Sequence, residues 1–225
     1  LSIDVEEDKL DAYRLRFEPL PCVCSDNPKH SPLKIGNHQL WLGNSASVLA
    51  SLPPNLVDAA VTSPPYYNAK EYSQWSNIYL YYADMKINAQ QVYRSLKDGG
   101  VYFFNIFNYF DNENDIVKSA MGKKRLILSS VITDIFTEIG FSLYGNIVWD
   151  KGHIEGKRGF NNGNFSPFHQ QPFNCWEHIL IFSKGTPKDR YIKDLPKVFA
   201  QKPYIKIIAG ENKLGHTAPF PIELP

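Results

Sequence analysis

The sequence predicts an α/β domain with a largely parallel sheet. Short apolar runs alternate along the chain with amphipathic stripes, in the order strand, helix, strand, helix, strand. Such alternation is typical of domains in which helices connect parallel strands. The chain has 225 residues, of which 43% are hydrophobic and 21% are charged, so it suits one globular domain with a substantial core.

The first elements are predicted to be short. Residues 1–37 resemble an arm, because prolines interrupt any long element there. Residues 39–42 are predicted to form a short strand, and residues 45–52 a short helix that a Pro-Pro pair stops. Residues 56–61 follow as a second strand, apolar enough to be buried on both faces.

Two amphipathic helices are predicted next. In the first, apolar side chains recur at spacings of three and four, and Gly99-Gly100 is predicted to end the helix. The second runs from Leu128 to Ile139 and ends at Gly140. The apolar positions of the first stripe are Ile78, Tyr82, Met85, Ala89, Val92 and Leu96.

Three further strands are predicted over residues 101–107, 141–149 and 175–182. The segment 150–172 is rich in Gly, Asn and Lys, and long loops of this kind are often functional. Residues 184–206 carry seven Lys or Arg residues against two Asp residues, which favours either contact with phosphate groups or a solvated linker.

Composition limits the class of protein. No apolar run reaches the length of a transmembrane helix and no signal peptide is recognisable, so a cytoplasmic protein without membrane contact is expected. Three cysteines are an odd number, which argues against a disulfide framework. Cys22, Cys24 and His30 fit no standard zinc spacing, and no metal site is predicted.

A proline corner, Thr62-Ser63-Pro64-Pro65-Tyr66, follows the second strand. Ligands of parallel sheets gather at the carboxyl ends of strands, where this corner lies. Proline lacks an N–H and fixes φ, so the Pro-Pro step holds rigid carbonyl oxygens without local donors. With the Ser63 hydroxyl and the flat face of Tyr66, the corner forms a slot for a planar group that carries an NH2. The edges of cytosine and adenine are such groups.

An exocyclic amine of a base is a poor nucleophile, because its lone pair is delocalised into the ring. Two acceptors that hold its hydrogens localise the lone pair and aim it at an electrophile. The corner therefore predicts alkylation of a base amine without a covalent enzyme intermediate.

The motif resembles the catalytic motif of amino-methyltransferases that act on DNA, at cytosine N4 or adenine N6. The order of segments, with the catalytic half first, is similar to the circularly permuted β group, and the similarity covers roughly residues 36–225. Other segments that resemble the family are residues 43–44, 52–58, 96–100, 147–151, 177–184 and 216–221.

The resemblance implies a Rossmann-like methyltransferase sheet, S-adenosylmethionine as cofactor and double-stranded DNA as partner. Ser63 and the Pro64 carbonyl would hold the target amine, with Pro65 keeping the corner rigid, while Tyr66 would stack on the flipped base. Residues expected to contact the cofactor are Asn44, Thr62, His216, Thr217, Ala218, Pro219 and Phe220. Residues expected to contact DNA are Tyr67, Lys151, Lys157 and Arg158, with loop packing or a solvated loop as the alternative.

One feature of the family is missing. The glycine-rich cofactor loop, Phe-x-Gly-x-Gly, is expected after the His216 segment and does not appear, so the sheet is expected to be incomplete at the C-terminus. The sequence thus predicts a fragment or one half of a split enzyme, with the loop on a missing C-terminal segment or a second chain; a homodimer is an alternative. The expected parts are an arm (1–37), a catalytic half (38–183), and a basic linker or target-recognition region with the start of the cofactor half (184–225).

The predicted function is site-specific DNA methylation in a restriction–modification system. Cytosine N4 is preferred over adenine N6, because Ser63 stands where adenine enzymes of the family more often have Asp. A DNA-binding module without turnover, and methylation of RNA or protein, are the alternatives.

Overall fold

A five-stranded sheet is the centre of the fold. The computed structural model describes residues 32–67, 73, 75, 78–107, 109–111, 125–152, 176–187 and 203–207. The strands lie in the order β3-β4-β8-β7-β9. Their bounds are β3 Val57–Thr62, β4 Leu96–Ile106, β7 Ser142–Asp150, β8 Trp176–Ser183 and β9 Tyr204–Lys206. β3 pairs with β4 and β7 with β9 in parallel, whereas β8 is antiparallel to β4 and β7. The predicted α/β fold is confirmed, and where a largely parallel sheet was expected the described sheet is mixed, with two parallel and two antiparallel strand pairs.

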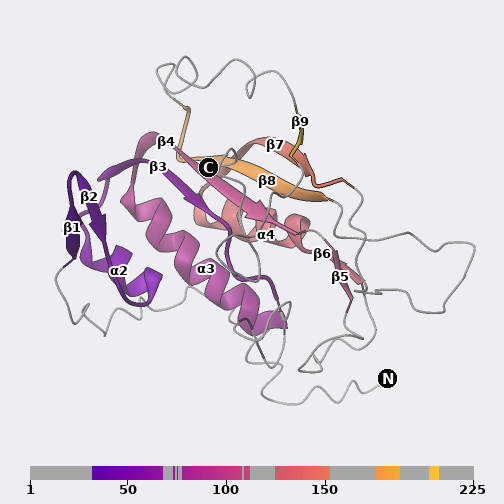
Figure 1. Cartoon of the computed structure of the whole chain (residues 1–225), viewed down its shortest axis with the longest axis horizontal. Helices are drawn as coiled ribbons and strands as arrows, with labels where there is room; N and C mark the ends of the chain where they lie inside the picture. Colours follow the sequence, from indigo (N-terminus) through magenta and orange to yellow (C-terminus); the bar gives the residue numbers. More distant parts are fainter. Residues whose placement is uncertain are drawn as a thin grey trace, which may run out of the picture.

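Helices α3 (Ile78–Ser95) and α4 (Leu128–Ile139) contact one another and lie along the sheet, as Figure 1 shows. The predicted end of the second stripe is confirmed, because Gly140 adopts φ 118° and its N–H bonds to carbonyl oxygens of the last turn. A shorter helix, α2 (Ser45–Ser51), contacts α3. None of the described helices combines the length and apolar character needed to cross a bilayer.

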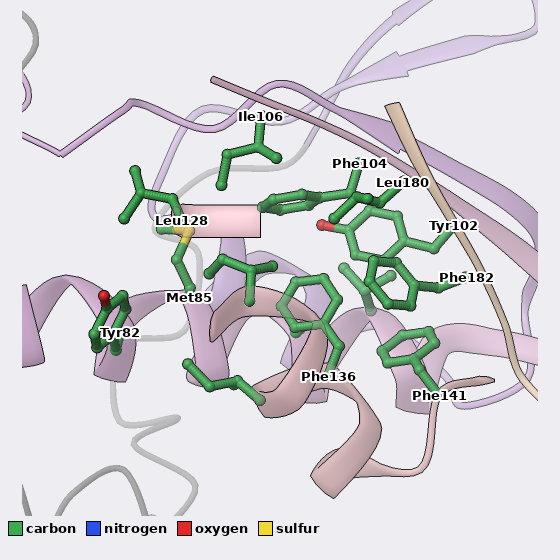
Figure 2. Packing of buried hydrophobic residues seen from close by; sticks show 14 of the residues in the cluster. Tyr82, Met85, Tyr102, Phe104, Ile106, Leu128, Phe136, Phe141, Leu180 and Phe182 are labelled. Carbon is green, nitrogen blue, oxygen red and sulfur yellow. The ribbon is translucent and has the colours of Figure 1, made fainter. Parts of the chain in front are cut away.

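Aromatic rings fill the space between these two helices and the sheet (Figure 2). Phe136 of α4 is fully buried and stacks on Tyr102 of β4, with ring centroids 5.8 Å apart and planes 9° apart. Phe104 and Phe182 meet the Phe136 ring at 5.0 Å and 4.9 Å, in edge or tilted arrangements. Rings of this kind bury large apolar areas, so this cluster fixes the strands against the helices.

A smaller apolar cluster lies on the opposite face of the sheet. Side chains alternate between the faces of a strand, so Ile179 of β8 points away from the face of Leu180 and Phe182. It joins Ile147 and Trp149 of β7 in a second buried group. The Trp149 indole N–H donates to the carbonyl oxygen of Ile207 at 2.9 Å, which ties the segment after β9 to this face.

The prediction that Gly99-Gly100 ends the first helix is wrong. Helix α3 ends at Ser95, and both glycines lie within β4. Val57 is paired with Leu96 but Ala59 with Val101, so the segment between them bulges out of the ladder. Glycine suits this bulge because a Cβ at Gly100 would lie 2.8 Å from the Lys97 carbonyl oxygen.

The second predicted strand is also exposed on one side rather than buried on both faces. β3 is an edge strand of the described sheet, and Val61 is 56% exposed. Its apolar composition alone gave no indication of its position at the edge.

Several elements differ from the sequence-based expectations because they depend on partners distant in sequence. The predicted strand 39–42 is instead a hairpin of β1 (Leu33–Ile35) and β2 (His38–Leu40), outside the main sheet. The pair formed by β5 (Tyr109–Asp111) and β6 (Arg125–Ile127) was not predicted. β9 was not predicted, since only its parallel pairing with β7 identifies it as a strand.

Replacement of Gly100 by alanine should destabilise the fold. The new Cβ would meet two backbone carbonyl oxygens, from Lys97 at 2.8 Å and Asp58 at 3.0 Å. Backbone atoms move less readily than side-chain ends, so we expect Gly100→Ala to lower the free energy of unfolding by about 1–3 kcal/mol in urea titrations. Gly145→Ala is the matched control: its Cβ would lie 3.4 Å from the flexible Ile181 side chain. Equal losses in both variants would contradict this account of the bulge.

Candidate functional site

The candidate site lies where the carboxyl ends of β3, β4 and β7 meet the start of β8. The strand pairing brings these ends together, because Ile106 lies opposite His178, and Asp150 opposite Trp176. Thr62 ends β3 beside Phe104, and the proline corner follows directly. Segments distant in the sequence thus place their side chains at one edge of the sheet.

The corner itself faces outward. Ser63 and Pro65 are exposed, and Pro64 is half-buried. Among the described residues, no hydrogen bond engages the carbonyl oxygens of these three residues. The rigid acceptors of this exposed corner therefore have no donor within the described part of the chain.

Behind the corner lies a hydrogen-bonded network that links three elements. The Tyr66 hydroxyl donates to Glu177 Oε2 at 2.6 Å, and it lies 3.1 Å from Ser63 Oγ. The Asn105 side-chain amide, from β4, donates to the Tyr66 hydroxyl oxygen at 2.7 Å and to Glu177 Oε2 at 2.5 Å. A longer contact of 3.4 Å joins the same amide nitrogen to Ser63 Oγ.

An ion pair anchors this network. Lys151 Nζ lies 2.5 Å from Glu177 Oε1, and their side chains are only 13% and 9% exposed. The ammonium also lies 5.4 Å from the centre of the Trp149 ring and 5.9 Å from that of Phe107. Buried charges are costly unless they are paired, so these contacts are what allow a carboxylate to lie here.

The Tyr66 hydroxyl is buried, whereas the residue as a whole is half-buried. Burial of its hydroxyl, followed by the nearby charge of Glu177, raises the pKa of Tyr66 well above its ordinary value. The phenol therefore remains protonated and serves as a donor. Its ring stacks on Phe107 with centroids 6.2 Å apart, and Tyr66 as a whole is half-buried.

Asn105 contributes one acceptor without a partner. Its Oδ1 is buried and makes no hydrogen bond to any described residue. Buried polar atoms are rarely left unsatisfied, so a water molecule or a donor of a bound molecule is the expected partner.

Two residues predicted to contact DNA are used by the protein itself. Tyr67 is 1% exposed and packs on Tyr81 at 5.7 Å between ring centroids, so its ring belongs to the core and offers no face to a base. Lys151 forms the buried ion pair described above rather than presenting its charge to solvent. Tyr66 therefore enters the site, while its neighbour Tyr67 enters the core.

Of the residues predicted to contact the cofactor, the structure describes Thr62 and Asn44, which belong to different elements. Thr62 ends β3 at the site. Asn44 instead caps α2, because its Oδ1 accepts from the N–H groups of Ala46 and Ser47 at 3.0 Å and 3.2 Å. The remaining predicted residues of the site, and the cysteines considered for metal, lie outside the described residues: Lys157, Arg158, His216, Thr217, Ala218, Pro219, Phe220, Cys22, Cys24 and His30.

Sequence reasoning missed three members of the site, namely Asn105, Phe107 and Glu177. A signal for two of them was present. Asn105 lies between apolar residues in the second half of β4, and Glu177, with His178, directly precedes the apolar run of β8. A polar residue in a buried strand needs a partner, which marks it as a candidate for a site.

The fold and the site together define an α/β domain with a rigid acceptor corner over a buried polar network. Residues 57–225 match the DNA methylase family, N6_N4_Mtase. The chain therefore belongs to the DNA methylase family, and the resemblance to DNA amino-methyltransferases is confirmed.

Individual relatives agree with this assignment. The chain is 46% identical over 202 residues to the type II beta methyltransferase M.BslI of Bacillus sp. (strain NEB-606), which covers 84% of this chain and 22% of that protein. It is 26% identical over 194 residues to the type II methyltransferase M.MwoI of Methanothermobacter wolfeii, covering 83% and 25%. The chain thus spans about a quarter or less of the length of these two relatives.

Solved structures share the fold. A putative DNA modification methylase from Thermus thermophilus superposes with a TM-score of 0.52 at 26% identity, covering 81% of this chain and 69% of that one. The cytosine-N4-specific PvuII DNA methyltransferase gives a TM-score of 0.56 at 18% identity, covering 88% and 71%. At this identity the second likeness concerns the fold alone.

Removal of the buried ammonium should be far more costly than removal of an exposed one. Lys151→Met leaves the Glu177 carboxylate unpaired, and we expect the free energy of unfolding to fall by about 3–5 kcal/mol. Lys97→Met is the matched control, because Lys97 pairs with Asp58 at 2.9 Å while the two side chains are 38% and 47% exposed. That change should cost about 0–1 kcal/mol. Urea unfolding of the two variants measures the difference, and similar losses would contradict the structural role given to the buried pair.

Proposed function

We propose that this chain is the catalytic half of a site-specific DNA methyltransferase of a restriction–modification system. It would transfer a methyl group from S-adenosylmethionine to the exocyclic amine of a base flipped out of double-stranded DNA. Membership of the DNA methylase family supports the reaction, and the type II methyltransferase names of the relatives support the biological setting.

The observation that carries this proposal is the outward-facing proline corner. Ser63 Oγ and the Pro64 carbonyl oxygen are acceptors on a backbone that two prolines make rigid. In the proposed reaction these two oxygens accept the two hydrogens of the target amine. Charge flow into the base ring is then reduced, and the nitrogen lone pair points away from both acceptors.

The proposed methyl transfer breaks one bond to carbon and forms another. S-adenosylmethionine supplies an electrophilic methyl group on a sulfonium. The N–CH3 bond forms as the S–CH3 bond breaks, and the amine nitrogen then releases one proton to solvent. The chain's own residues orient the amine, and the ring of Tyr66, held by its hydroxyl, offers a fixed surface on which the base can stack.

More of the residues proposed to hold the target amine are described by the structure than of those proposed to hold S-adenosylmethionine. Thr62 lies at the site, but the Asn44 acceptor is already engaged by the cap of α2. In our proposal the segment His216–Phe220 contacts S-adenosylmethionine, as the family resemblance implies. A glycine-rich loop on a further segment or a second chain would complete the cofactor site, with a homodimer as another arrangement.

Cytosine N4 is the preferred target in this proposal. Ser63 at the head of the motif, where adenine enzymes of the family more often have Asp, favours cytosine. Adenine N6 is the alternative within the same chemistry.

Lys157 and Arg158 are proposed to contact DNA phosphates. A DNA-binding module without turnover is the alternative from another class.

Nucleoside mass spectrometry tests the proposal directly. The complete protein that carries this chain is incubated with duplex DNA and S-adenosylmethionine, and N4-methylcytosine is expected after digestion. Ser63→Ala removes one acceptor and should lower kcat by about tenfold or more while DNA affinity stays near that of the wild type. Ser130→Ala, at an exposed position of α4, is the control. Detection of N6-methyladenine instead would identify adenine as the target base. DNA binding without methylation would favour the non-catalytic alternative.

Loss of the Tyr66 ring should weaken engagement of the base. Tyr66→Ala is expected to reduce binding of DNA with an unpaired target base by about 1–3 kcal/mol, the usual value of one base–aromatic stack. Fluorescence anisotropy with such a duplex measures this loss. Tyr144→Ala, at a position 57% exposed on β7, should leave binding unchanged. Equal affinities for the Tyr66 variant and the wild type would remove the stacking role.

A further inference from the structure

We propose that Glu177 is a positioning residue that fixes the direction of the Ser63 hydroxyl, through the hydroxyl of Tyr66. Ser63 would then present its lone pairs, rather than its hydrogen, to the target amine. The inference rests on the proposed function. It assigns a task in that reaction to a side chain of β8, which lies outside the proline corner.

Glu177 determines which atom donates in each hydrogen bond between Glu177, Tyr66 and Ser63. Glu177 forms an ion pair with Lys151, whose Nζ lies 2.5 Å from Oε1. An ionised carboxylate accepts hydrogen bonds and cannot donate one. The Tyr66 hydroxyl, at 2.6 Å from Oε2, must therefore give its hydrogen to Glu177. Because burial raises the pKa of Tyr66, the phenol retains the hydrogen that it donates.

Asn105 reinforces this direction. Its amide nitrogen lies 2.5 Å from Glu177 Oε2 and 2.7 Å from the Tyr66 oxygen and acts as the donor to both, while its contact with Ser63 Oγ is longer, at 3.4 Å. The reverse orientation of the amide would place Oδ1 against a carboxylate oxygen at the same short distance, which is repulsive. The Tyr66 oxygen thus gives away its own hydrogen, receives one from Asn105 and keeps one acceptor position.

That remaining position faces Ser63. Ser63 Oγ lies 3.1 Å from the Tyr66 oxygen, and its hydrogen is the donor still available to that oxygen. With its hydrogen directed inward, Ser63 Oγ keeps its lone pairs for other donors, and Asn105 reaches one of them only by the long 3.4 Å contact. Glu177 is buried whereas Ser63 is exposed, so these lone pairs lie on the side from which a base arrives.

Replacement of the Glu177 carboxylate by an amide should allow these hydrogen bonds to reverse direction. A glutamine at position 177 carries an NH2 that can donate to the Tyr66 oxygen. The Tyr66 hydrogen can then turn toward Ser63 and occupy a lone pair of Oγ. The Ser63 hydrogen is released and can point at the incoming amine, which is itself a donor, and the acceptor is lost.

Steady-state kinetics of the complete protein test this role. Glu177→Gln should lower kcat for DNA methylation by about tenfold or more, as expected for one misdirected hydrogen bond, with KM for DNA changed by less than about twofold. Asp98→Asn is the matched control, because Asp98 is 89% exposed and lies 4.0 Å from Lys184. It should leave both constants unchanged. An unchanged kcat in Glu177→Gln would overturn the inference.

A double-mutant cycle separates positioning from a merely structural role. Tyr66→Phe keeps the ring and removes the hydroxyl through which Glu177 would act. In this background Glu177→Gln should lower kcat by less than about twofold, because the link to Ser63 is already broken. A structural role predicts the same loss in both backgrounds, and that result would contradict the inference while leaving the proposed function intact.

A spectroscopic titration gives a readout that does not need activity. In protein labelled with [13Cζ]tyrosine, the Tyr66 resonance is assigned by its loss in Tyr66→Phe. Burial is the main reason that the pKa of Tyr66 is raised, and the Glu177 carboxylate raises it further, so Glu177→Gln should lower it. An unchanged titration would overturn the inference by itself. A wild-type protein that methylates no base would instead overturn the proposed function and the acceptor role that depends on it.

Discussion

The buried carboxylate of Glu177 is the constraint on which the candidate site depends. A charge in the sheet needs compensation, and three other segments provide it: Lys151 after β7, Asn105 from β4 and Tyr66 after β3. Contact with the Glu177 carboxylate holds each of these side chains in place. The exposed proline corner is thus fixed from behind by an interaction that is itself shielded from water.

The architecture of the sheet brings these partners together. Parallel strands end at the same edge, and the antiparallel β8 begins there. Residues Asn105 and Glu177 point to the face of Ile179 and Trp149, while alternate residues of the same strands point to the aromatic core under α3 and α4. One pair of strands therefore carries the core on one face and the polar network on the other.

The residues that set the strand positions are different from those that form the candidate site. The aromatic cluster around Phe136 sets the strand positions, and the network transmits them to Ser63 and Tyr66. The corner adds stiffness of its own, because proline restricts the backbone on which the acceptors lie. Precise acceptor geometry is what a reaction without a covalent enzyme intermediate requires, since orientation supplies most of its acceleration.

The sequence by itself determined the order of the main elements, the helix Leu128–Ile139 and the family. Periodicity, a helix-ending glycine and a short motif are local properties that can be recognised without partners. The tertiary structure decided which of Tyr66 and Tyr67 enters the site, that Lys151 pairs with Glu177, and that Gly100 lies in a strand. Each of these depends on residues distant in the chain, because burial, charge pairing and strand register exist only once the sheet has assembled.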